Sequence, residues 1–156
     1  MNTTVKRISG TAVALVLLAL APSVLLLALT SWVATEFGSF PLLWTVPLGL
    51  YLGSFMVAFS DTVPDGWLRP FWPDVLLALG LFACLAGEPL LHPLLYTAFF
   101  LVCWQVHAAL YRQRPEAGGL TVFYLAVAFG GWLGGAAVTL GAPALFPGLW
   151  ELPLGV

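Results

Sequence analysis

Gln105 and His107, two polar side chains near the end of a long apolar run, are the residues of this sequence best suited to chemistry. Ionisable groups inside a bilayer are costly and often functional. The imidazole of His107 could ligate a haem or chlorophyll, hydrogen-bond to a neighbouring helix, or reach interfacial water. His92 lies at the opposite end of the same run, about 22 Å away at 1.5 Å per residue, so the two rings cannot share a ligand. We interpret His107 as a structural histidine and keep cofactor ligation as the alternative.

The other reactive side chains are isolated from one another in the sequence. Cys84 and Cys103 lie in separate apolar runs, whereas zinc sites use clustered ligands at short spacing. Asp74 stands where a helix is expected to start, and a carboxylate there interacts favourably with the positive end of the helix dipole. No predicted span carries a carboxylate at mid-membrane, as a cation transporter normally would. The sequence therefore predicts no catalytic residue, no metal site, no cofactor and no enzymatic activity.

The composition excludes a water-soluble protein. Hydrophobic residues make up 61% of the chain and charged residues only 8%, and the mean hydropathy is +1.00. Water-soluble domains carry roughly 25% charged residues. One bilayer crossing needs about 20 residues, so the 156 residues leave room for about five or six helices with short loops. We therefore expect a single all-α membrane domain surrounded by the lipid bilayer, with no nucleic acid among its partners.

The apolar runs predict a polytopic bundle of five transmembrane helices. The first run exceeds the roughly 7 to 15 apolar residues of a signal peptide, and Pro22 follows its Ala-x-Ala match, so we expect the run to remain as a helix. Pro22 and Pro47, both in mid-span, should bend their helices. Residues 141–156 contain three prolines and are expected to lie along the membrane interface. The predicted spans are about 11–33, 41–59, 71–86, 90–111 and 120–140.

The cationic residues indicate the orientation of the bundle. With five spans, all of them fall on one side of the membrane, and the positive-inside rule assigns that side to the cytoplasm. We therefore expect a cytoplasmic amino terminus and a carboxyl terminus on the opposite side of the membrane. The cationic residues are Lys6, Arg7, Arg69, Arg112 and Arg114.

Paired glycines create a face of small residues on the last predicted span. Small residues let helix backbones approach closely in lipid, where no hydrophobic effect drives helix association. We expect this face to pack inside the chain, and packing against another subunit is the alternative. The glycine pair of the second span could supply the matching surface. The helix-packing residues are Gly49, Gly53, Gly130, Gly131, Gly134 and Gly135.

Several segments from Pro41 onward occur in the same order in a known family. They are FPLLWTVPLGLYLGSF at Phe40–Phe55, His107 with Arg112-x-Arg114-Pro115, LTVFYL at Leu120–Leu125, the glycine pairs of Gly130–Gly135, and ELPL from Glu151. In these segments the chain resembles the membrane portion of bacterial fused major-facilitator/spermidine-synthase-like proteins, in which a multi-helix membrane region is joined to an aminopropyltransferase-like domain. We expect the chain to lack the synthase-like domain, and Ala109 and Val122 stand where the family tends to carry glutamates. The resemblance implies a membrane fold more than an activity, and it implies a bacterial inner membrane, with the carboxyl terminus on the periplasmic side.

The expected function is that of a non-enzymatic accessory or structural subunit that packs against a larger membrane protein complex. The alternative is a small transport or ligand-binding membrane domain that acts with a separate spermidine-synthase-like partner. A buried polar cavity would favour the ligand-binding domain. A broad apolar surface in contact with another chain would favour the accessory subunit.

Overall fold

The computed structural model describes residues 2–38, 40–60 and 92–141, and every regular element in these ranges is a helix. Four of the described helices are long and apolar enough to cross a membrane, which confirms the all-α class and is consistent with a multi-pass membrane protein. The predicted span 71–86 lies outside the described residues, as do residues 142–156 of the predicted tail. The described elements are α1 (Asn2–Phe37), α2 (Pro41–Phe59), α4 (His92–Arg112), the short 3₁₀ helix η2 (Ala117–Gly119), α5 (Leu120–Ala136) and the π-helical η3 (Ala137–Gly141).

α1 begins earlier and ends later than the predicted span 11–33. Its bounds are Asn2–Phe37, and Ala12–Thr35 is its long apolar part. The polar residues ahead of the apolar run contain no proline, so none of them stops the helix. The helix ends where Gly38 adopts a φ of 81°, a left-handed conformation that favours glycine. Pro41 then starts α2, where its missing N–H costs no helical hydrogen bond.

The other described spans lie close to their predicted bounds. α2 matches the predicted 41–59, α4 begins at His92, and α5 together with η3 covers the predicted 120–140. Pro22 and Pro47 are buried within α1 and α2, and both helices continue through them.

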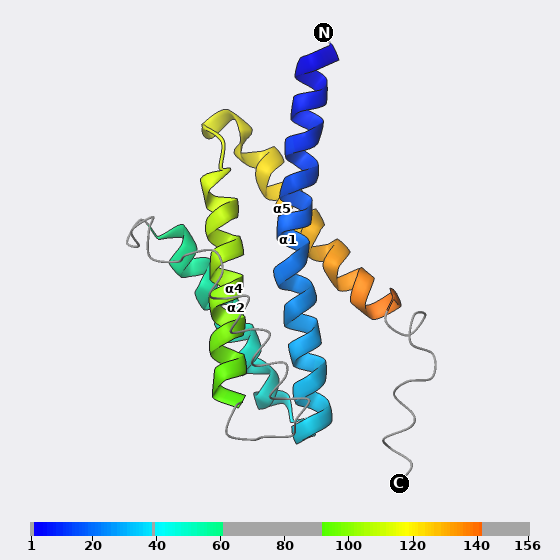
Figure 1. The fold of residues 1–156 in the computed structure, drawn as a ribbon, viewed down its shortest axis with the longest axis vertical. Helices are drawn as coiled ribbons and strands as arrows, with labels where there is room; N and C mark the ends of the chain where they lie inside the picture. Colours follow the sequence, from blue (N-terminus) through cyan, green and yellow to red (C-terminus); the bar gives the residue numbers. More distant parts are fainter. Residues whose placement is uncertain (1, 39, 61–91, 142–156) are drawn as a thin grey trace.

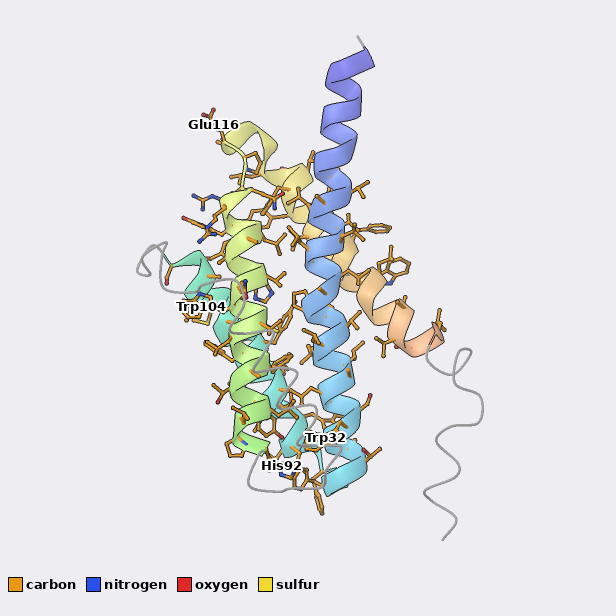
Figure 2. All side chains as sticks on the ribbon, viewed as in Figure 1. Trp32, His92, Trp104 and Glu116 are labelled. Carbon is orange, nitrogen blue, oxygen red and sulfur yellow. The ribbon has the colours of Figure 1, made fainter. Side chains whose placement is uncertain are left out.

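α1 lies between the α2–α4 pair and α5 (Figure 1). Among the described helices, α1 packs against the other three long ones, α2 packs against α4, and α5 packs along α1. The rings of Trp32 and Phe37, near the end of α1, contact His92 at the start of α4 (Figure 2). At the opposite end of the bundle, Phe59 of α2 contacts Tyr111 of α4. α2 and α4 therefore run parallel to each other and antiparallel to α1.

Two clusters of buried side chains hold α1 against its neighbours. The first cluster joins α1 to α4, and the second joins α1 to both α4 and α5. Close packing is the main source of stability here, because lipid tails are as apolar as the side chains. The first cluster contains Leu29, Val33, Leu95, Phe99 and Cys103, and the second contains Leu15, Ala19, Leu110 and Phe123.

Candidate functional sites

The glycines of α5 face α1. A methyl group placed on Gly130 would lie 2.5 Å from the carbonyl oxygen of Val16 and 2.8 Å from the Cβ of Ala19. A methyl group on Gly134 would lie 2.8 Å from the carbonyl oxygen of Leu20. These distances are too short for a real side chain, so the two backbones could not keep their spacing if either glycine were replaced. The approach also brings the glycine Cα–H groups towards carbonyl oxygens, a weak but recurrent contact at helix crossings.

Gly131 and Gly135 lie at the edge of the same crossing. A methyl group on Gly131 would lie 3.4 Å from the hydroxyl of Ser23, and one on Gly135 would lie 3.9 Å from Leu27. These are ordinary van der Waals distances or only slightly tighter. The close approach of the helices therefore depends on Gly130 and Gly134 more than on the other pair.

The matching surface on α1 is a small-residue pair that the sequence reasoning missed. Ala19 lies against Gly130, and Ser23 lies against Gly134. Ala19 and Ser23 have the same spacing as the two glycines, so the backbones approach at successive turns. The order of the contacts shows that α5 runs parallel to α1. The signal was present in the sequence as Ala19-x-x-x-Ser23 within the first apolar run.

The expectation that α2 could supply the matching surface is wrong. No contact between α2 and α5 occurs within the described part of the chain, because α1 lies between them. A methyl group on Gly49 would meet nothing within 4 Å, and one on Gly53 would lie 3.8 Å from the ring of Phe100 on α4. The glycine pair of α2 therefore belongs to other surfaces, Gly53 to the α2–α4 contact and Gly49 to the exposed side of α2.

His107 is part of a buried polar contact between α2 and α4. Its side chain is 1% exposed, and its Nδ1 lies 3.0 Å from the hydroxyl oxygen of Ser54, which is fully buried. The Ser54 hydroxyl donates its single proton to the carbonyl oxygen of Tyr51, 2.7 Å away. The Ser54 hydroxyl oxygen therefore accepts a hydrogen bond from His107, which must carry its proton on Nδ1. This assignment makes Nε2 the acceptor nitrogen of the ring.

Aromatic rings enclose the imidazole. Tyr51 and Phe55 of α2 contact His107 edge-on, with ring centroids 5.1 Å and 5.0 Å from it. A haem or chlorophyll ring would have to displace one of these rings to reach the imidazole. The geometry therefore favours the structural interpretation of His107.

Ser54 was not singled out from the sequence. Its role depends on the parallel packing of α2 and α4, which brings residues far apart in the chain to the same depth. A buried histidine in lipid needs a polar partner, and that need was the signal that could have prompted a search of the other spans.

The remaining sequence candidates that the structure describes do not gather into a site. Within the described ranges, no three His, Cys, Asp or Glu side chains come close enough together to hold a metal ion. Cys103 is buried in the first cluster, and Gln105 is partly buried on α4. Asp74 and Cys84 lie outside the described residues.

The sequence matches no protein-family model, no curated protein and no solved structure. The resemblance to the membrane portion of spermidine-synthase-like proteins therefore rests on its quoted segments alone.

Proposed function

We propose that this chain is a non-enzymatic, multi-pass subunit of a bacterial inner membrane that packs against a larger membrane protein complex. The observation that carries the proposal is the open face of α5. Among the described helices, α5 packs along α1 alone, so no other described helix covers its opposite side. Phe129 is 51% exposed and Trp132 is 66% exposed on that side.

The aromatic pair on the open face of α5 suits a protein contact. The rings of Phe129 and Trp132 lie 5.6 Å apart and tilt by 31°. Large aromatic side chains are over-represented among the residues that dominate binding at protein interfaces. Val122 and Leu125 extend the same apolar surface towards the start of α5. A partner helix could pack along the whole surface without burying a charge.

Five crossings and a cytoplasmic amino terminus remain part of the proposal. The parallel directions of α2 and α4 support an additional crossing, because the chain leaves α2 at one end of the bundle and enters α4 at the other. The parallel directions of α1 and α5 support an odd number of crossings in total. Arg112 lies at the same end as the start of α1, where Lys6 and Arg7 are found, as the positive-inside rule requires for a cytoplasmic end (Figure 1).

A photoreactive amino acid at position 132 tests the proposed contact in native membranes. We expect irradiation to join the chain to another protein and to shift it to a higher mass. The matched control is the same amino acid at Met56, an exposed position on α2. If position 132 cross-links only to lipid, the open face of α5 is not a protein contact and the proposal fails.

A second function is favoured by the buried contact between Ser54 and His107. Polar pairs within a bilayer often mark the path or binding site of a solute. On this reading the chain is a small transport or ligand-binding domain that acts with a separate spermidine-synthase-like protein. Solute binding or uptake by the purified chain in liposomes, abolished in His107→Leu but retained in Ser60→Ala, would support it.

A further inference from the structure

The cationic residues of the described part of the chain gather at one end of the bundle. Arg112 and Arg114 are exposed where α4 ends, and the start of α1 with Lys6 and Arg7 lies at the same end (Figure 1). Among the described acidic residues, only Glu116 shares this end, on the turn between α4 and α5 (Figure 2). The end is therefore strongly cationic.

The length of α4 places Arg112, its last residue, at the level of the lipid headgroups, and Arg114 follows two residues later. The helix has 21 residues, and a helix of that length spans roughly 30 Å. The hydrocarbon core of a bilayer is also about 30 Å thick. If His92 lies at one boundary of the core, Arg112 lies at the other. The phosphates of the lipids are found directly beyond that boundary.

The ring of Tyr111 holds one of the arginines in place. The guanidinium carbon of Arg114 lies 4.7 Å from the centre of the Tyr111 ring, a cation–π contact. Tyr111 is in turn held from α2 by Phe59, whose ring centroid lies 5.1 Å from its own. A guanidinium held against a ring loses less freedom when it binds an anion than a freely moving side chain does.

We propose that Arg112 and Arg114 form a binding site for the phosphate of an anionic phospholipid headgroup. Guanidinium groups match phosphate oxygens in charge and in geometry and often bind them through two parallel hydrogen bonds. The depth of the two arginines identifies the occupant as a lipid rather than a soluble anion.

Native mass spectrometry of the detergent-solubilised protein tests this site. The protein is mixed with equimolar phosphatidylglycerol and phosphatidylcholine of equal chain length, and the ratio of retained lipids is measured. Each cation near an anionic lipid surface contributes about 1 kcal/mol, so we expect the preference for phosphatidylglycerol to fall roughly fivefold for each arginine replaced in Arg112→Gln and Arg114→Gln. Glu116→Gln is the matched control and should keep or raise the preference.

Three outcomes would overturn the lipid site. Equal retention of the two lipids by the unaltered protein would show that no anionic headgroup is selected. The preference for phosphatidylglycerol could also fall equally in Lys6→Gln/Arg7→Gln and in Arg112→Gln/Arg114→Gln. That result would show a general electrostatic attraction to this end of the bundle instead of a binding site formed by Arg112 and Arg114. Displacement of phosphatidylglycerol by inorganic phosphate would show a site for a soluble anion. The exposed positions of Arg112 and Arg114 allow both variants to fold, which gel filtration would verify.

Discussion

At the scale of single residues, Ser54 and His107 form the most informative contact of the described structure. Ser54→Ala removes the acceptor of the His107 Nδ1–H and leaves a buried donor without a partner. Such a loss costs about 1–3 kcal/mol in water-soluble proteins and about 1 kcal/mol in membrane helices. We expect Ser54→Ala to lower the midpoint of thermal unfolding in detergent. Ser60→Ala is the matched control, because its exposed hydroxyl bonds only to the carbonyl of Val57 in the same helix.

The same contact predicts the protonation state of the imidazole. Nitrogen-15 NMR of the purified protein should show the Nδ1 of His107 carrying the proton and Nε2 without one. The opposite assignment would mean that Ser54 donates to His107 and that the tautomer derived from Tyr51 is wrong. A haem or chlorophyll absorption band that disappears in His107→Leu would overturn the structural role altogether.

At the scale of helices, the crossing of α1 and α5 depends on two glycines. Gly130→Leu or Gly134→Leu should separate the helices, because even a methyl group at either position would lie too close to the backbone of α1. Overpacking a tight contact costs about 1–3 kcal/mol, and a contact with backbone should fall at the upper end of that range. Resistance to unfolding in detergent measures the effect. Gly49→Leu is the control, since a side chain there would enter open space and should be tolerated.

The glycine pattern shows how much of the helix packing could be predicted from the sequence. Its spacing predicted a close helix crossing in α5, and four glycines do face another helix. The partner could not be chosen from spacing, because small residues recur at four-residue intervals on α1 and α2 as well. That choice depends on which helices become neighbours, and α1 separates α2 from α5.

The helix bounds could also be predicted from the sequence, whereas the partner of His107 could not. The apolar runs of the sequence predicted the bounds of the four described spans to within a few residues, apart from the early start of α1. The sequence predicted His107 as a structural histidine, with a neighbouring helix or interfacial water as its hydrogen-bond partner. Its partner Ser54 could not be predicted, because the pairing requires the parallel packing of α2 and α4.

At the scale of the whole molecule, the topology can be tested without purification. We expect a periplasm-dependent reporter fused after Val156 to be active, and the same reporter inserted between Arg112 and Gly118 to be silent. The reason is that the cationic end should face the cytoplasm, and an odd number of crossings places the two ends on opposite sides. The insertion site is exposed between α4 and α5, so the reporter should be tolerated there. The reverse pattern would contradict the five-helix proposal.

The central proposal is that this chain works through a partner. The described helices leave a broad apolar surface on α5. The most direct measurement is the size of the particle that the untagged, natively expressed protein forms in mild detergent. We predict migration with a larger assembly, and weakening of that assembly when the chain is removed. A monomer that binds or moves a small solute after reconstitution into liposomes would contradict the proposal.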